Sequence, residues 1–247
     1  MGQSRTRARR GLPWKYIALG LLAVAVIAVS SVAMFMRPDP PASAVSYTPP
    51  PPAPELPIVA VIGDSYTAGN SYGGMNAKNW TKVARADLYA GGQSMNLVVR
   101  GLGAAGYATP GTAKLKFSQV VESIMGPKTD VVVMVGSRND MNAKPEAVRQ
   151  ASAETYALVK KTSPNAKLLI VGPMWVNENV PDSIKSLRDA VRASALEVGA
   201  TFVDPIDEGW FFGENATLIG SDRVHPTDAG HAYLAKLIGP HIKVALS

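Results

Sequence analysis

Residues 58–70, IVAVIGDSYTAGN, decide the fold of this chain. The apolar run 58–62 predicts a short buried strand, and the Gly63-Asp64-Ser65 sequence after it predicts a tight turn into a helix. Similar apolar, β-branched runs follow at 96–99, 130–135, 167–171 and 201–204. Helix-like stretches lie between and after these runs, near 77–91, 112–125, 145–161, 182–199 and 227–245.

Short apolar strands that alternate with amphipathic helices are typical of a parallel sheet covered by helices on both faces. We therefore expect an α/β fold, a three-layer α/β/α sandwich with a parallel sheet of about five strands. In such sheets the functional site forms outside the carboxyl ends of the strands. The loops that follow the predicted strands are therefore where functional residues are expected.

The formal net charge of +6 is carried by residues 1–37, which hold six basic residues and no acidic one. From residue 38 onward, 19 basic side chains are balanced by 19 acidic ones, so the composition predicts no nucleic-acid partner. The chain contains no cysteine, which excludes disulfides and a thiol nucleophile.

The N-terminal part of the chain predicts a membrane anchor. Residues 1–15 are basic, and the 21 residues 16–36 carry no charge. A helix over 16–36 would span about 30 Å, the thickness of the bilayer core. The basic residues before it predict a cytoplasmic N-terminus and an extracytoplasmic remainder. A signal peptide cleaved near Ala44 is the alternative, although this apolar run is longer than an ordinary signal-peptide core.

The rest of the chain is expected to form one folded domain in the bacterial cell envelope. Residues 37–57 are rich in proline and predict an extended linker. Residues 58–247 then make up the α/β domain, held away from the membrane by that linker.

Three residues from opposite ends of this domain could act together in nucleophilic catalysis. Ser65 follows the first strand at a turn that can present its hydroxyl at the sheet edge, although such a serine is also a common helix N-cap. Asp222 and His225 are three residues apart, just before the last helix. A serine nucleophile needs a base, and the base needs an acceptor that orients it, which an Asp-x-x-His turn can supply.

Two other loops carry groups that could stabilise negative charge. Asn139 can direct an amide N–H at an oxyanion, although a lone asparagine is often only a turn residue. The sequence GLGAAG at 101–106 has the spacing of a dinucleotide-binding turn. Because residues 107–111 interrupt any helix start, we expect no nucleotide there, and predict a close-packed loop with a backbone N–H beside the serine.

In this order, the four loops resemble the blocks of the SGNH (GDSL-like) hydrolase family, over about residues 58–245. The matching residues are Ser65 in GDSY, Gly106 in GAAGYAT, Asn139 in SRND, and Asp222 and His225 in DRVH. The resemblance implies a flavodoxin-like sheet and ester hydrolysis without a metal or other cofactor. It also implies an oxyanion hole made of the Ser65 and Gly106 backbone N–H groups and the Asn139 side chain.

The chain departs from the family pattern in two places. An extra residue within GLGAAG leaves open whether Gly103 or Gly106 is the oxyanion donor. Arg138 is inserted directly before Asn139, where it could form a structural salt bridge or contact an anionic group of the substrate.

Other candidate substrate contacts are aromatic. Tyr107 follows the matching glycine, and Trp210 and Phe211 belong to an aromatic cluster that precedes the Asp-x-x-His turn. At least one residue of that cluster is expected in the core. The glycine-rich stretch 70–75 is expected to form a mobile rim.

The expected activity is that of a serine esterase that cleaves O-acyl groups from glycans, glycolipids or lipids of the cell envelope through an acyl-enzyme. Two alternatives stay open at this point: an acyltransferase that passes the acyl group to a sugar hydroxyl, and a catalytically silent glycan-binding protein. Hydrolase and transferase differ only in the acceptor, which the sequence does not reveal.

Overall fold

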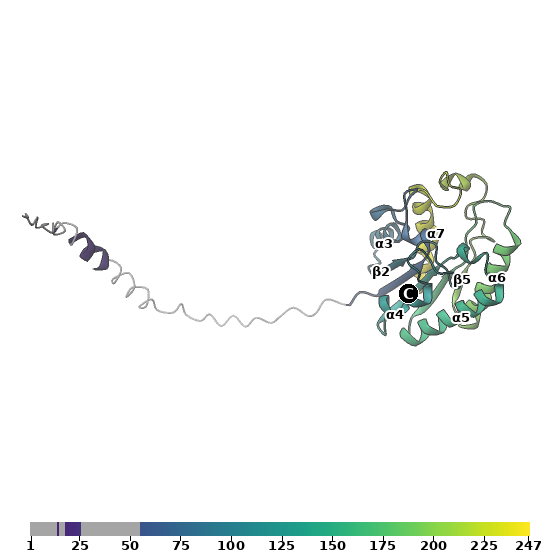
Figure 1. Cartoon of the computed structure of the whole chain (residues 1–247), viewed down its shortest axis with the longest axis horizontal. Helices are drawn as coiled ribbons and strands as arrows, with labels where there is room; N and C mark the ends of the chain where they lie inside the picture. Colours follow the sequence, from purple (N-terminus) through teal and green to yellow (C-terminus); the bar gives the residue numbers. More distant parts are fainter. Residues whose placement is uncertain (1–13, 15–17, 26–54) are drawn as a thin grey trace, which may run out of the picture. The chain divides into compact units, whose positions relative to one another are not determined.

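The computed structural model describes residues 14, 18–25 and 55–247. The chain divides into two units, Met1–Ala53 and Pro54–Ser247 (Figure 1). Residues 18–25 are helical, and among the described residues no helix has the length and apolar character needed to cross a membrane. The predicted basic segment 1–15, membrane span 16–36 and linker 37–57 lie for the most part outside the described residues.

The second unit is built on a five-stranded parallel sheet in the order β2-β1-β3-β4-β5. Its strands are β1 (Ile58–Gly63), β2 (Asn96–Gly101), β3 (Thr129–Val135), β4 (Lys167–Val171) and β5 (Thr201–Val203). The order is flavodoxin-like, with the topological switch point between β1 and β3. Gly63 pairs with Gly101 on one side and with Val135 on the other, so these three strands end side by side.

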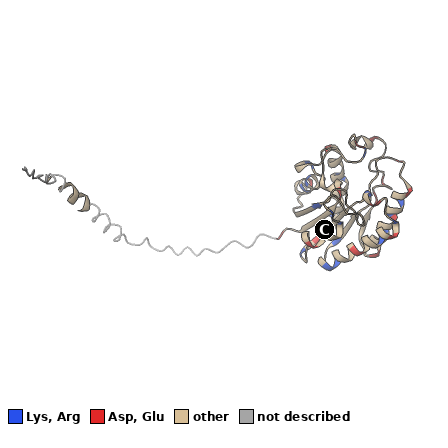
Figure 2. Cartoon of the chain, in the orientation of Figure 1, with Lys and Arg blue, Asp and Glu red and all other residues tan. Residues whose placement is uncertain are grey.

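Helices cover both faces of the sheet, which confirms the predicted three-layer α/β/α architecture. On one face α3 (Trp80–Ala90) packs against α7 (Asp228–Leu246), and on the other lie α4 (Val121–Ile124), α5 (Pro145–Thr162) and α6 (Asp182–Glu197) (Figure 1). Shorter helices occur in the loops: α2 (Ser65–Ala68), η1 (Asn76–Lys78), η2 (Phe117–Val120), η3 (Arg138–Asp140) and η4 (Gly213–Leu218). Basic and acidic side chains are interspersed along α5 and α6, in keeping with a solvated outer surface (Figure 2).

One predicted helix is much shorter than expected. In place of a helix over 112–125, the chain forms η2 and the single turn α4. Backbone hydrogen bonds hold the preceding residues in a turn, because Thr112 donates to the Gly103 carbonyl and Gly111 donates to the Leu115 carbonyl. These non-helical pairings remove the first turn of the predicted helix.

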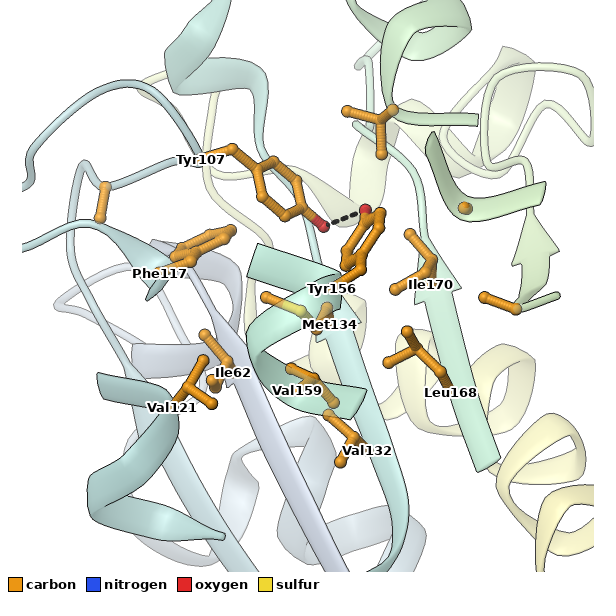
Figure 3. Packing of buried hydrophobic residues seen from close by; sticks show 14 of the residues in the cluster. Ile62, Tyr107, Phe117, Val121, Val132, Met134, Tyr156, Val159, Leu168 and Ile170 are labelled. Atoms are coloured by element: carbon orange, nitrogen blue, oxygen red, sulfur yellow. Dashed lines mark hydrogen bonds between the residues drawn. The ribbon is translucent and has the colours of Figure 1, made fainter. Parts of the chain in front are cut away.

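The alternation of side chains along the strands creates two cores. Ala60 and Ile62 of β1 face the α5 side, whereas Val59 and Val61 face the α3 and α7 side. Both cores are closed to solvent, and the first contains a hydrogen-bonded tyrosine pair, in which the Tyr156 hydroxyl donates to that of Tyr107 at 2.8 Å (Figure 3). The sheet is therefore a rigid support for the loops at its carboxyl edge.

Candidate active site

Ser65 is the first residue of α2, directly after β1. Asp64 caps this helix, because its Oδ1 accepts the Tyr66 backbone N–H at 2.9 Å. Gly63 has no room for a side chain, since a Cβ there would lie 2.2 Å from Thr67 Oγ1. The close strand-to-helix turn therefore presents the Ser65 hydroxyl at the sheet edge, as the sequence predicts.

His225 and Asp222 reach Ser65 from the segment before α7. His225 Nε2 lies 3.0 Å from Ser65 Oγ, and His225 Nδ1 lies 2.6 Å from Asp222 Oδ2. Because a carboxylate only accepts, Nδ1 carries the proton and Nε2 is left to accept the Ser65 hydroxyl. The structure thus places the hydroxyl, imidazole and carboxylate in one hydrogen-bonded series.

The second oxygen of Asp222 organises the same turn. Asp222 Oδ1 accepts the backbone N–H groups of Val224 and His225, each at 3.0 Å. Burial alone would raise the pKa of Asp222, but the hydrogen bonds from the His225 side chain and from both backbone groups lower it below the usual value. Asp222 is therefore ionised wherever His225 could act as a base.

Tyr66 connects the helix that carries Ser65 to the turn that carries Asp222 and His225. Its hydroxyl donates to the Val224 carbonyl, which connects α2 to the turn that carries His225. Sequence reasoning missed this residue, and the only signal available was an aromatic residue directly after the serine. A second bond supports the turn from within, as the Gly220 N–H donates to the His225 carbonyl at 2.7 Å.

Asn139 lies in η3, across the switch point from Ser65. Its Nδ2 donates to the Ala105 carbonyl at 2.8 Å and, more weakly, to Asp64 Oδ2 at 3.3 Å. Its backbone N–H is accepted by Ser137 Oγ at 3.0 Å. The side chain is thus held beside the serine turn, with its longer hydrogen bond directed at the residue before the nucleophile.

Gly106, one of the two glycines expected as oxyanion donor, uses its N–H within its own loop. Its N–H donates to the Thr109 carbonyl at 2.8 Å, so it is directed elsewhere. Gly106 instead provides space, because a Cβ there would lie 2.3 Å from Asp140 Oδ2. That carboxylate accepts the N–H groups of Tyr107 at 2.8 Å, Ala108 at 3.1 Å and Thr109 at 2.8 Å. Asp140 therefore closes the loop, a role that the sequence did not reveal.

Unlike Gly106, Gly103 has a backbone N–H that is free to donate, since it has no hydrogen-bond acceptor within the described part of the chain. The residue is also only half-buried. Gly101 pairs with Gly63, so Gly103 and Ser65 each lie two residues beyond paired ends of neighbouring strands. This register brings the Gly103 backbone to the same edge as the Ser65 hydroxyl.

Asp64 is the buried ionisable group closest in sequence to Ser65. Burial raises its pKa to about 6, although the Tyr66 N–H, Ser137 and the positive charge of Arg138 act in the opposite direction. The carboxyl group is 3% exposed, so its charge depends on these neighbours.

Within the described part of the chain, Arg138 forms no salt bridge, which was one of its two expected roles. Its guanidinium carbon lies 4.3 Å from the centre of the Trp175 ring, a cation–π contact. Among the residues that the structure describes, Arg138 Nη1 and Trp175 Nε1 are both buried without a hydrogen-bond partner. Arg138 also lines a small cavity, together with Asp64 and Tyr66.

The other aromatic candidates for substrate contact are part of the cores. Tyr107 is 1% exposed and bonded to Tyr156, and Trp210 and Phe211 are 2% and 0% exposed. Trp210 Nε1 donates to Glu208 at 2.7 Å, and Phe211 packs edge-on against Tyr66. Each ring is enclosed by protein in this structure, which confirms the expectation that at least one residue of the 210–211 cluster lies in the core.

The described residues contain no group of three or more His, Cys, Asp or Glu side chains arranged to hold a metal ion. What they do bring together is a serine hydroxyl, an imidazole and a carboxylate at the carboxyl edge of a parallel sheet. That arrangement on this fold is characteristic of a serine hydrolase.

Comparison with known proteins identifies the family. A sequence model described as GDSL-like Lipase/Acylhydrolase family matches residues 61–233. The GDSL lipase Rv0518 of Mycobacterium tuberculosis (strain ATCC 25618 / H37Rv) is 40% identical over 191 residues, which cover 76% of this chain and 82% of that protein. The chain therefore belongs to the GDSL-like lipase/acylhydrolase family and is a carboxylic ester hydrolase.

Solved structures show the same fold at lower identity. Est24, a carbohydrate acetylesterase from Sinorhizobium meliloti, matches with a TM-score of 0.59 at 18% identity, covering 76% of this chain and 99% of Est24. The lipase/acylhydrolase from Enterococcus faecalis matches with a TM-score of 0.62 at 16% identity, covering 76% of this chain and 96% of that protein.

Proposed function

We propose that Ser65, His225 and Asp222 are the catalytic triad of this ester hydrolase. The observation that carries the proposal is the pair of distances in series, 3.0 Å from Ser65 Oγ to His225 Nε2 and 2.6 Å from His225 Nδ1 to Asp222. Both lie in the range in which a proton can be transferred or an imidazolium stabilised.

The reaction proceeds in two halves. As Ser65 Oγ attacks the ester carbonyl, His225 Nε2 takes the hydroxyl proton and then gives it to the departing alcohol oxygen, leaving an acyl-enzyme. Water attacks the acyl carbonyl in the second half, and the same nitrogen takes the water proton and returns it to Ser65. Asp222 keeps the imidazole in the required tautomer throughout.

The oxyanion of each tetrahedral intermediate is held by the Ser65 N–H, the Asn139 side chain and the Gly103 N–H. Gly103 replaces Gly106 in this proposal because the Gly106 N–H is already used by Thr109. Asn139 contributes the hydrogen that now makes the 3.3 Å bond to Asp64, the weaker of its two contacts. Asn139 must exchange that bond for one to the oxyanion, whereas the Gly103 N–H, which has no acceptor among the described residues, needs no such exchange.

The substrate class that we propose is an O-acyl ester of the cell envelope, on a glycan, a glycolipid or a lipid. The relatives named above include a lipase and a carbohydrate acetylesterase, which is consistent with either kind of alcohol. A groove of about 600 Å³ beside the His225 turn offers both polar and apolar surface for the part of the substrate that does not react. Its lining includes Val176, Asn177, Ile219, Ser221 and Arg223.

Arg138 is proposed to contact a polar or anionic group of that substrate. This role is supported by the position of Arg138 directly before Asn139 and beside the small cavity that Asp64 and Tyr66 also line. The proposed location is the outer face of the cell membrane, with residues 16–36 as the anchor, because their length and lack of charge suit a bilayer.

The proposal is tested by measuring ester hydrolysis by the parent, Ser65→Ala and the surface control Ser186→Ala on short-chain esters, long-chain esters and acetylated polysaccharides. We expect Ser65→Ala to lose nearly all turnover on every substrate and Ser186→Ala to match the parent. If Ser65→Ala cleaved 4-nitrophenyl acetate as fast as the parent, the triad assignment would be wrong. The preferred substrate of the three identifies the acyl chain and the alcohol.

A further inference from the structure

The loop 70–75, which the sequence predicts to be a mobile rim, packs closely against the His225 turn and the start of α7. Asn70 and Gly73 exchange two backbone hydrogen bonds, at 2.9 and 3.2 Å, and Asn70 Oδ1 accepts the Tyr72 N–H at 2.8 Å. A Cβ on Gly73 would lie 2.3 Å from the Thr227 carbonyl carbon, and one on Gly74 would lie 2.1 Å from the His231 ring. The glycines thus allow close contact, and Tyr72 stands at the tip of a well-defined turn.

The Tyr72 ring lies beside the imidazole of His225 and nearly parallel to it. The two rings are nearly parallel, with an angle of 10° between their planes and 6.1 Å between their centres, which is an offset-stacked arrangement. The same ring also contacts Gly220, where a Cβ would come within 2.9 Å of Tyr72 Cδ1. Because Gly220 is hydrogen-bonded to the His225 carbonyl, Tyr72 packs on both the ring and the backbone of this turn.

Hydrogen bonds alone do not fix the orientation of the His225 ring. The imidazole is held by one hydrogen bond at each ring nitrogen, to Asp222 and to Ser65, and can still tilt about the line that joins the two nitrogens. A parallel aromatic ring restricts that tilt and so keeps Nε2 directed at Ser65 Oγ. The other aromatic neighbour, Tyr66, is inclined at 45° to the imidazole and does not provide a flat surface.

Tyr72 is also accessible to substrate. Its side chain is 42% exposed and lines a groove of about 420 Å³ with Asn70, Ser71, Asn76 and Lys78. Tyr72 therefore has one side toward His225 and another toward an open groove.

We infer that Tyr72 is a positioning residue, which holds the His225 ring for proton transfer to the leaving alcohol. The inference rests on the proposed role of His225 as the base and acid. It goes beyond that role by predicting a dependence on the leaving group. A 4-nitrophenolate departs without a proton, whereas an alkoxide needs one, so a poorly held imidazole impairs the cleavage of alkyl esters more.

The test compares the parent, Tyr72→Phe, Tyr72→Leu and Tyr72→Ala on two acetate esters, 4-nitrophenyl acetate and ethyl acetate. For Tyr72→Leu and Tyr72→Ala we expect kcat for 4-nitrophenyl acetate to fall about 3- to 10-fold with KM little changed, the loss expected for one stacked aromatic pair. The loss on ethyl acetate should be about 10-fold larger again. Tyr72→Phe, which keeps the ring, should restore both activities to near the parent values.

Tyr89→Ala is the matched control, since Tyr89 is 70% exposed on α3, outside the candidate site, and its change should leave both rates unaltered. Equal losses on both esters in Tyr72→Leu and Tyr72→Ala, or a Tyr72→Phe protein as impaired as Tyr72→Ala, would overturn the positioning role. So would parent-like rates in all three variants. The triad is judged separately, because reaction of Ser65 with a fluorophosphonate in the Tyr72 variants shows it intact even if the role of Tyr72 is refuted.

Discussion

Replacing Asp222 by asparagine tests how the carboxylate controls the imidazole. The amide oxygen of Asp222→Asn can still accept the Val224 and His225 backbone N–H groups, so the turn should keep its shape. The amide nitrogen then takes the place of Oδ2, 2.6 Å from His225 Nδ1, and can only donate. Nδ1 must therefore give up its proton, and Nε2 must carry it.

An Nε2 that carries the proton cannot accept the one from Ser65, so the variant lacks its base in the resting tautomer. This substitution costs about 10⁴ in kcat where a triad has this geometry, or about 5 kcal/mol of transition-state stabilisation. The assay is steady-state hydrolysis of 4-nitrophenyl acetate, with thermal unfolding to show that the variant is folded.

Asp87→Asn is the matched control for this substitution. It makes the same carboxylate-to-amide change at an exposed position on α3, outside the candidate site, and should keep the parent rate. A folded Asp222→Asn protein with a rate within about 10-fold of the parent would refute the reasoning.

Three further outcomes follow from single contacts. Asn139→Ala should lower kcat about 10²- to 10³-fold with the fold intact, the usual loss for one oxyanion donor, and a parent-like kcat would exclude that role. His231 is 1% exposed, and burial lowers its pKa to about 4, against 6.5 in the unfolded chain. Acid therefore protonates the unfolded state first, and the stability that the neutral imidazole contributes is lost as the pH falls from about 6.5 to 4. Between pH 7 and pH 4, urea unfolding should therefore show the parent losing up to about 3 kcal/mol more free energy of unfolding than His231→Gln. The titration of Asp64 is common to both proteins and cancels in this comparison. Equal losses in the two proteins would contradict the prediction. Tyr156→Phe should lower the free energy of unfolding by about 1–2 kcal/mol, because it leaves the buried Tyr107 hydroxyl without its partner, whereas the exposed Tyr89→Phe should have no effect in the same denaturant titration.

The sheet and most of its helices could be predicted because their patterns are local. The strand 58–62 and the helices near 145–161 and 182–199 differ from the observed elements by only a residue or two at an end. Their apolar periodicity reflects burial on one face or on both, which neighbouring residues reveal without knowledge of the fold. The helix expected over 112–125 failed because contacts with the Gly103 loop, absent from any local pattern, hold its first residues in a turn.

In the candidate site, too, residues in local motifs could be predicted and residues whose role depends on distant contacts could not. Ser65, Asp222 and His225 are recognisable because each stands in a short motif beside a predicted strand end or helix start. The role of Gly106 cannot be recognised in this way, because it depends on Asp140, 34 positions later. The Asp140 carboxylate occupies the space that a side chain on Gly106 would take. In the sequence, Trp210 and Phe211 are candidates for substrate contact. Their burial depends on packing against α7 and Tyr66, which no local pattern reveals.

Reaction of the full chain with a fluorophosphonate, followed by peptide mapping, tests the central claim most directly. The account predicts a single covalent adduct on Ser65, formed in the parent and lost in Ser65→Ala and in His225→Ala. An adduct on another serine, or equally rapid labelling of Ser65 without the His225 imidazole, would contradict the account.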